Sequence, residues 1–530
     1  MNKENYSALK SRRAFIRQTA CAAVGTAALS NTLRDLHFIN SAVAQSSATG
    51  YKALICVFLN GGNDANNLII PTSPAEWASY AGVRTPVLAI PNADGGPATA
   101  QALASMNGLA GFPAADGHTY GLHPALIELA KSFNQTNAAS AAKVAAMLNV
   151  GTLSYPLTKA QYFANSVPKP PQLFSHSDQQ IQWQTSIPDR PPVSGWGGRI
   201  ADLLTTPVDI NAGGQISMAI TLAGSNKFEV GDLNAAAQYS VTTSGAVGTS
   251  STFTNAPSRL PTLQSILNTD KALPDLQIGA YGKVLDHAMA EAGLVTNALA
   301  GNAAAPWLAY FGNAATGTGN STVVTPNGGS TFNSGLMSQM KMVARLIDAG
   351  KKNYVGNVSG TGFGMKRQIF FVQVGGYDTH TGQTNNAGAV TVDNTKVILG
   401  QQANLFAELS QSLNALMKAM TDLGMANEVT AFTVSDFART FPSNGLGSDH
   451  GWGGHQIVVG GAVKGGATYG KLPALTVNGP DDTGTGRWIP TMAVDQYAAE
   501  LASWFGVDSS NLTTIFPNLG RFGRMSVPFI

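Results

Sequence analysis

The sequence predicts an α/β fold: a doubly wound, mostly parallel central sheet flanked by helices, with a loop-rich insertion. Two patterns predict this class. Four apolar runs of strand length end in or adjoin Gly, Asp or His, and longer segments with helical spacing lie between them. Strands that alternate with helices are typical of a parallel sheet covered on both faces. A chain of 530 residues is long enough to bury a large core.

The predicted strands and helices follow from local composition. The strands are short runs rich in Val, Ile, Leu and Phe that stop at turn-forming residues, and they span 51–59, 368–374, 429–434 and 456–460. The helices have apolar residues near the i, i+3, i+4 spacing and span 122–133, 335–349, 403–423 and 495–504. Residues 226–333 are rich in Gly, Ser and Thr, so we expect a loop-rich insertion with helices near Leu263 and over 280–300.

The first 44 residues have the features of an export signal. Arg12 and Arg13 precede a weak apolar run, and Ala42-Val43-Ala44 forms a small-residue cleavage motif. This order predicts twin-arginine export to the periplasm or beyond, with residues 45–530 as the mature domain; an ordinary amphipathic helix is the alternative. The apolar run is too short for a bilayer of about 30 Å, so we expect no stable membrane span.

Charge argues against a nucleic-acid partner. Charged residues make up only 12% of the chain, against about 25% in an average domain. Residues 1–44 contain 6 of the 32 Lys and Arg and 2 of the 30 Asp and Glu, so the rest has 26 basic and 28 acidic residues and a net charge of −2. No basic run remains in that part, and we therefore expect no nucleic-acid binding. Of the two cysteines, only Cys56 remains, so the mature domain cannot form an internal disulfide.

Polar residues that could bind a metal follow the predicted strands. In GGYDTHTGQ, Asp378 and His380 are two residues apart and point to the same side of an extended segment, which suits one ion; a turn capped by Asp378 is the alternative. Asp436 ends the strand at 429–434, as either a ligand or a helix cap, and Arg439 follows it. SDHGWGGH then supplies His450 in a glycine-rich loop.

Two further motifs complete the candidate site. Asp64 follows the first strand in a turn that Asx hydrogen bonds could also explain. FSHSDQQ contains Ser175 and His176 before a predicted helix, where Ser175 is either a reactive hydroxyl or an N-cap. Because a parallel sheet gathers the carboxyl ends of its strands at one edge, we expect the Asp and His residues of these motifs to converge there.

These motifs together resemble the domain of unknown function 1501 family. The resemblance rests on NGGNDANNLIIP, LFSHSDQQIQWQT, GWGGRIAD, VARLIDAG, GGYDTHTGQ and SDFARTFPSNGLGSDHGWGGH, and it runs from about residue 50 to 520 apart from the insertion. The family is assigned to the alkaline phosphatase and sulfatase superfamily. The resemblance therefore implies an alkaline-phosphatase-like sheet and a site for one or two divalent metal ions.

The resemblance also implies roles for the individual residues. Asp64 and Asp436 correspond to ligands of the metal on the nucleophile side, and Asp378, His380 and His450 to ligands of the second metal. Ser175, with His176, stands where the nucleophile stands. Arg439 or Arg199 would hold the substrate anion. Mixed carboxylate and imidazole ligands favour zinc, manganese or iron.

The implied activity is hydrolysis of phosphate or sulfate esters, on a small molecule or a polymer. Two departures from the superfamily pattern favour an alternative. Phe437 occupies the position of a histidine ligand, and Asp378 and His380 are closer in sequence than the usual pair. The alternative is a non-catalytic exported protein that binds metal or assembles with a protein partner through the insertion.

Overall fold

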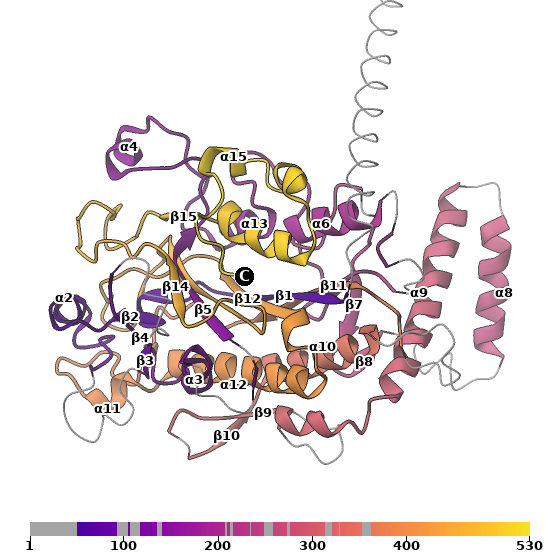
Figure 1. The fold of residues 1–530 in the computed structure, drawn as a ribbon, viewed down its shortest axis with the longest axis horizontal. Coiled ribbons are helices and arrows are strands. Elements are labelled where there is room, and N and C mark those ends of the chain that lie inside the picture. The colour runs from indigo at the N-terminus through magenta and orange to yellow at the C-terminus, as the bar shows by residue number, and fades with distance from the viewer. Residues whose placement is uncertain are drawn as a thin grey trace, which may run out of the picture.

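In a computed structural model of the chain, the described residues form one large sheet with helices on both faces (Figure 1). The described residues are 50–92, 104–106, 117–134, 140–141, 143–206, 209–211, 216–233, 235–247, 258–272, 276–312, 321–327, 329–351 and 362–530. The predicted signal at 1–44 lies outside them.

Parallel strands form the centre of the sheet. β1 (Lys52–Leu59) lies between β11 (Arg367–Val374) and β12 (Val429–Ser435), and all three run in the same direction. Leu59, at the end of β1, is in register with Val374 and Ser435. The carboxyl ends of these strands therefore lie at one edge, as the sequence predicts.

The rest of the sheet is mixed. β13 (Gly454–Gly460) is antiparallel to both of its neighbours, β12 and β5 (Lys143–Gly151). The sequence pattern predicted a mostly parallel sheet, and most of the strand pairings are parallel, but β13 makes the sheet partly antiparallel. Parallel strands need a crossover connection, usually a helix, and no helix lies between β12 and β13.

Short strands complete the two sides of the sheet. β14 (Ala467–Gly470) and β15 (Met492–Ala493) pair in parallel with β5. On the other side, β6 (Ala219–Thr221) pairs with β11, and β7 (Tyr239–Thr242) forms a hairpin with β8 (Gly245–Ala246).

Alternate residues of β1 build two cores. Ala53, Ile55, Val57 and Leu59 face one core, which contains residues of α3 (Ile127–Phe133), α10 (Gly335–Lys351) and α12 (Gln401–Asp422). Leu54, Cys56 and Phe58 face the other, which contains residues of α6 (Trp196–Thr205) and α13 (Val494–Phe505). A strand buried on both faces is an uninterrupted apolar run, which is how β1 was recognised. Figure 1 shows the two helical layers above and below the sheet.

The predicted helices are present with one shifted boundary. The helix predicted over 122–133 begins only at Ile127, because Leu122 ends β4 and Pro124 follows His123. The His123 ring accepts a hydrogen bond from the Ala125 backbone N–H at 3.1 Å, which stabilises the turn between strand and helix. The strand β5 was not predicted.

The remaining elements surround the sheet or pack against its helices. The insertion contains the predicted helix pair, α8 (Arg259–Ala272) and α9 (Leu276–Ala300), and α8 stands apart from the sheet at the right of Figure 1. The other elements are β2 (Ile69–Pro71), β3 (Ala104–Met106), β4 (Tyr120–Leu122), β9 (Thr322–Val324), β10 (Thr331–Asn333), α2 (Pro74–Arg84), α4 (Lys159–Ala164), α5 (His176–Thr185), α11 (Asn394–Val397), α14 (Leu512–Ile515), α15 (Leu519–Phe522) and the 3-10 helices at Ala65–Asn67, Pro306–Phe311, Ala426–Glu428 and Ser509–Asn511.

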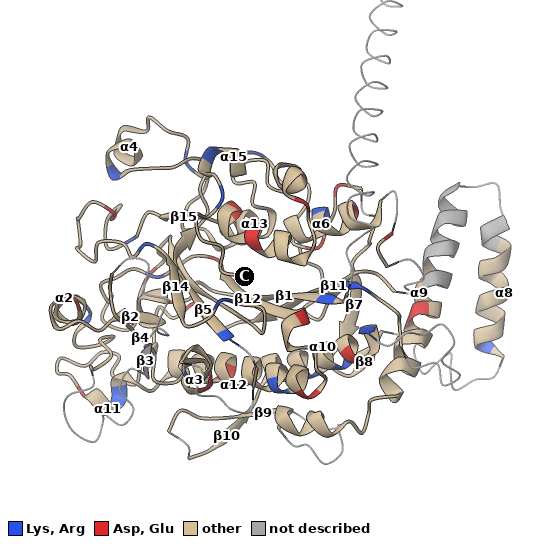
Figure 2. Ribbon diagram, in the orientation of Figure 1, with Lys and Arg blue, Asp and Glu red and all other residues tan. Residues whose placement is uncertain are grey.

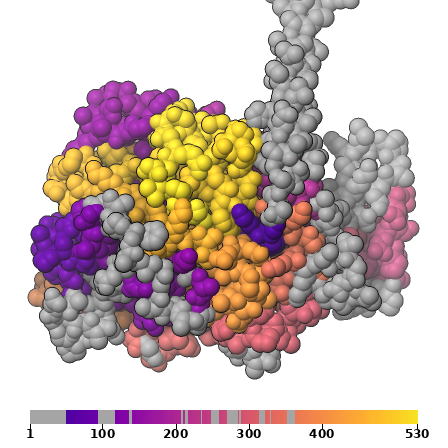
Figure 3. Space-filling model, viewed as in Figure 1, coloured from indigo at the N-terminus to yellow at the C-terminus, as the bar shows by residue number. Residues whose placement is uncertain are grey.

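The charged residues are dispersed over the fold. Figure 2 shows Lys, Arg, Asp and Glu scattered among the elements rather than gathered on one face. In the described part of the chain, no helix combines the length and apolar character needed to cross a bilayer. The C-terminal helices form a continuous part of the surface, in yellow, over the top of the molecule (Figure 3).

Candidate metal centre

Four elements bring polar side chains to the carboxyl edge of the central strands. Asp378 lies four residues after the end of β11, and Asp436 directly follows β12. His450 lies four residues before β13, which starts at this edge because it is antiparallel to β12. His176 is the first residue of α5. Among the described residues, His176, Asp378 and His450 can place one ligand atom each within 4.8 Å of one another.

The orientation of His176 is set by a buried carboxylate. His176 Nδ1 lies 2.7 Å from Asp436 Oδ2, and Asp436 is fully buried. Asp436 also accepts hydrogen bonds from Gly61 N–H at 3.1 Å and from the Gln180 side chain at 2.8 Å. The Asp436 carboxylate accepts from both of these donors and faces His176 Nδ1, so Nδ1 is the ring nitrogen of His176 that donates and carries the proton. Nε2 of neutral His176 is therefore an available lone pair.

His450 is oriented in the same way by a backbone carbonyl. Its Nδ1 lies 2.8 Å from Phe174 O, and a carbonyl oxygen can only accept, so Nδ1 is again the protonated nitrogen. Phe174 has φ of 72°, an uncommon conformation for a bulky residue. His450 Nε2 consequently faces His176 Nε2 at 3.1 Å. Two lone pairs at this distance repel each other unless a cation, either a proton or a metal ion, lies between them.

Asp378 provides the negative charge of the cluster. Its Oδ1 lies 3.4 Å from His450 Nε2 and 3.6 Å from His176 Nε2. The same oxygen accepts a hydrogen bond from Arg439 Nη1 at 2.6 Å. Two imidazole nitrogens and one carboxylate oxygen are a ligand set that suits zinc, manganese or iron.

His380 lies beside Asp378 and His450. Its Nδ1 is 2.9 Å from Asp378 Oδ1, and its Nε2 is 3.9 Å from Asp449 Oδ1. Its ring centroid is 4.7 Å from that of His450. His380 therefore borders the group of three and contacts its carboxylate.

The pKa values of His176 and His450 are shifted in opposite directions. The hydrogen bond to Asp436 raises the pKa of His176 above its ordinary value, and the charge of Asp378 adds to the effect against partial burial. Burial lowers the pKa of His450, and the neighbouring charges of His176 and Arg439 lower it further. Burial acts to raise the pKa of Asp378, but the hydrogen bond from Arg439 and its charge hold that pKa below its ordinary value.

Phe437 forms an apolar wall of the cluster. Its ring centroid lies 4.8 Å from that of His176 and 4.7 Å from that of His450, and the residue is buried. The side chain thus packs against both candidate ligands.

Asp64 forms an ion pair outside the group of three. Its buried carboxylate forms a salt bridge with buried Arg84 and accepts a hydrogen bond from Gln383. Arg84 also donates to Phe441 O at 2.7 Å. The structure therefore places Asp64 in a buried ion pair and not in the group of three.

The two arginines considered as anion clamps are also engaged. Arg439 is fully buried and donates to Asp378, to Gly61 O at 3.2 Å and to Ser448 O. Arg199 donates to the backbone carbonyls of residues 185, 194 and 515. Arg439 thus orients Asp378, and Arg199 joins segments of the core.

Ser175 lies at the N-cap position of α5. Its hydroxyl makes no cap hydrogen bond to the helix backbone. It donates instead to Asp178 Oδ2 at 2.6 Å. The residue before it, Phe174, contacts His450, and the residue after it is His176, so the hydroxyl belongs to a segment fixed at both ends by the cluster.

Sequence reasoning missed three contributors. Gln180 lies one helical turn after His176, and this i, i+4 spacing was visible in FSHSDQQ. Phe174 acts through its backbone, and Arg487 donates from Nε to His450 O at 2.8 Å. Neither contribution has a sequence signal, because each depends on a tertiary contact.

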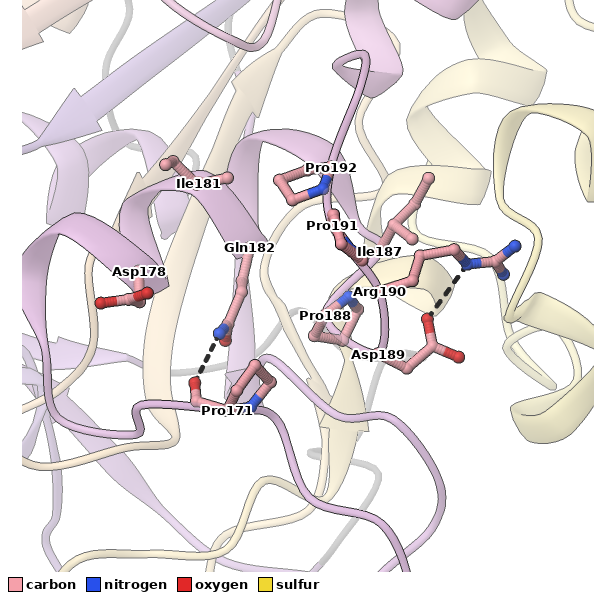
Figure 4. Close-up of a pocket in the computed structure, with 10 residues that line it drawn as sticks. All are labelled: Pro171, Asp178, Ile181, Gln182, Ile187, Pro188, Asp189, Arg190, Pro191 and Pro192. Atoms are coloured by element: carbon pink, nitrogen blue, oxygen red, sulfur yellow. Dashed lines mark hydrogen bonds and ion pairs between the residues drawn. The ribbon is translucent and has the colours of Figure 1, made fainter.

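A separate cavity lies beside α5. It has a volume of about 350 Å³, and its walls are mainly apolar. Figure 4 shows its lining, with the Gln182 amide on the Pro171 carbonyl and Arg190 paired with Asp189. Asp178 and Gln182 line it, and Asp178 is also the acceptor of the Ser175 hydroxyl, so the cavity lies beside the segment that leads into His176.

The fold and this cluster define an α/β protein with a His/Asp group at the carboxyl edge of its sheet. Residues 363–484 match the family described as "Protein of unknown function (DUF1501)", so this segment of the chain is similar to that family. The matched segment contains Asp378, His380, Asp436, Arg439 and His450. No curated protein matches the chain.

Proposed function

We propose that this protein is an exported, metal-dependent hydrolase of phosphate or sulfate esters, with a fold of the alkaline phosphatase and sulfatase type. The observation that carries the proposal is the pair of histidine Nε2 atoms 3.1 Å apart, each with its Nδ1 bound to an acceptor. With Asp378 beside them, these atoms fit a divalent ion of zinc, manganese or iron. Export rests on Arg12, Arg13 and the motif at 42–44, which precede the described residues.

The residues divide the work as follows. His176, His450 and Asp378 would hold the ion, while Asp436, the Phe174 carbonyl and Arg439 orient them. A bound divalent ion supplies Lewis acidity toward the oxygens of an anionic ester. Ser175 is the nucleophile: its oxygen would bond to the phosphorus or sulfur of the ester as the bond to the alcohol leaving group breaks, and its proton would pass to Asp178 Oδ2 along the 2.6 Å hydrogen bond. Water would then release the phosphate or sulfate from Ser175. The N-terminus of the ten-residue helix α5 favours negative charge at this position.

Phe437 favours a second candidate function. It places a hydrophobic ring where the superfamily pattern has a histidine ligand, and a site with fewer ligands is compatible with metal binding without hydrolysis. In this alternative the protein is an exported metal-binding component that contacts a partner, with the insertion at 226–333 as the contact region.

Elemental analysis of protein purified without chelator tests the proposal. We expect about one zinc, manganese or iron ion per chain, lost in Asp378→Ala and in His450→Ala. His118→Ala is the matched control, because His118 pairs with Glu76 outside the cluster. Ser175→Ala should keep the metal and abolish hydrolysis of aryl phosphate and aryl sulfate substrates. Bound metal without hydrolysis in the wild type would support the second candidate, and absence of metal would reject both.

A further inference from the structure

Arg487 lies against the two residues that fix one side of the cluster. Its Nε donates to His450 O at 2.8 Å, and its guanidinium carbon lies 4.6 Å from the ring centroid of Phe174. Phe174 and His450 are themselves joined by the 2.8 Å contact between Phe174 O and His450 Nδ1. The guanidinium is therefore at the border of the candidate metal centre, beside the backbone that leads into Ser175.

Most hydrogen-bond donors of Arg487 are unused. A guanidinium has five N–H groups, and within the described residues only Nε makes a hydrogen bond; neither Nη atom has a hydrogen bond or an ion pair there. Arg84, Arg439 and Arg199 differ, since their Nη atoms are bound to carboxylates or carbonyls. Arg487 is thus half-buried, and its two Nη atoms form no hydrogen bond or ion pair within the described residues.

The loop that carries Arg487 is held in one conformation. The buried carboxylate of Asp482 accepts hydrogen bonds from the backbone N–H groups of Asn478, Gly484 and Arg487 at 2.7, 2.7 and 2.9 Å. Thr483 N–H also donates to Arg487 O at 3.0 Å. Because the loop and the stacked side chain are already ordered, an anion that binds here would not have to order them.

We propose that Arg487 binds the anionic group of the substrate at the metal centre, an inference that rests on the proposed function. The planar fork of a guanidinium fits two oxygens of a tetrahedral oxyanion, and its charge is not neutralised by any described carboxylate within ion-pair distance. The substrate class is therefore an ester with an ionised tetrahedral group, phosphate or sulfate. Arg487 takes the role that the sequence suggested for Arg439 or Arg199.

Binding of inorganic phosphate and inorganic sulfate to the metal-loaded full chain tests this role. Titration calorimetry would compare the wild type with Arg487→Gln and Arg487→Lys, and metal content would be measured in each sample. Arg521→Gln is the matched control: Arg521 also stacks on a ring, Tyr155 at 4.1 Å, and donates to a carbonyl, but it pairs with Asp189.

We expect Arg487→Gln to keep its metal and to weaken binding of the preferred anion at least tenfold, with Arg487→Lys in between and Arg521→Gln unchanged. The anion that binds more tightly identifies the ester class. Three results would overturn the role of Arg487 without overturning the proposal of a metal centre in the wild type. They are equal anion binding by Arg487→Gln and wild type, loss of metal from Arg487→Gln, and a metal-loaded wild type that binds neither anion. A wild type without metal would overturn the proposed function and this inference together.

Discussion

The tautomers of the two histidines at this site are fixed by hydrogen-bond acceptors that face their Nδ1 atoms. His176 faces a carboxylate and His450 faces a carbonyl, so both present Nε2 toward Asp378. Such acceptors behind a histidine are the usual support of a metal ligand, since they fix the ring and increase its basicity. In this arrangement Asp436 contacts Nδ1 of His176, whereas the sequence predicted that Asp436 itself binds metal.

The substitution Asp436→Asn tests this division of roles. All donors around Asp436 point at its oxygens, so an amide would place an N–H group against one of them in a fully buried position. We expect metal affinity to fall about 10- to 100-fold while metal still binds at saturation, measured by competition with a chromogenic chelator. Complete loss of binding, equal to that of His450→Ala, would instead make Asp436 a direct ligand.

The residue types of the site were predictable, but their roles were not. Asp378, His380, Asp436 and His450 were identified because short polar motifs follow apolar runs, and His176 because it stands beside Ser175 in such a motif. Their proximity follows from topology. Whether a carboxylate faces the ion or the back of a histidine depends on distances of a few ångströms, which spacing in a sequence does not fix. Asp64 illustrates this, since its partner Arg84 lies 20 residues away in a helix.

At the scale of the elements, the turn after β1 and the turn after β11 lie in close contact and set the positions of the acidic residues of the site. Gly61 follows β1 with φ of 119°, and a Cβ there would lie 2.3 Å from Asp378 N. Gly61 N–H also donates to Asp436. The glycine therefore lets the turn after β1 touch the turn after β11, and it contacts both acidic residues of the site.

We expect Gly61→Ala to destabilise the fold by about 3 kcal/mol or more and to reduce metal binding, because steric overlap adds to backbone strain. Gly424→Ala is the matched control: Gly424 also has positive φ, 65°, but nothing lies within 4 Å of its added Cβ. That control should cost only about 1–2 kcal/mol and leave metal binding unchanged. Urea denaturation and chelator competition measure the two effects, and equal losses in both variants would contradict the close-approach argument.

The predictable elements were those with long, uniform patterns. β1, β11 and β12 were recognised as apolar runs, and α10, α12 and α13 from their periodicity. The direction of β13 was not predictable, because the residues between β12 and β13 contain no helix to signal either a crossover or its absence. β5 was overlooked because alanines interrupt its branched residues, and its burial depends on pairing with β13.

At the scale of the whole molecule, Glu229 and Asp495 are two buried carboxylic acids that do not belong to the candidate metal centre. Burial raises the pKa of Glu229 to about 7, against the effect of hydrogen bonds from Asn226 and Gln238. Burial likewise raises the pKa of Asp495 to about 7, although the nearby Ser186 side chain and the charge of Arg199 oppose it. Both groups make global stability depend on pH.

The sign of this dependence follows from the unfolded chain. There Glu229 has an ordinary pKa of 4.5, whereas in the folded protein its pKa is about 7. Between these values the unfolded chain releases the proton and the folded chain retains it, so the free energy of unfolding falls as pH rises and is lowest above pH 7.

We expect Glu229→Gln to be more stable than the wild type at pH 8, by on the order of 3 kcal/mol at most, with a smaller difference at pH 5. Urea denaturation at both pH values measures it. Asp393→Asn should show no such gain, because hydrogen bonds from Thr395 lower the pKa of half-buried Asp393. A constant difference between Glu229→Gln and wild type from pH 5 to 8 would mean that Glu229 is already ionised at pH 5 in the folded protein.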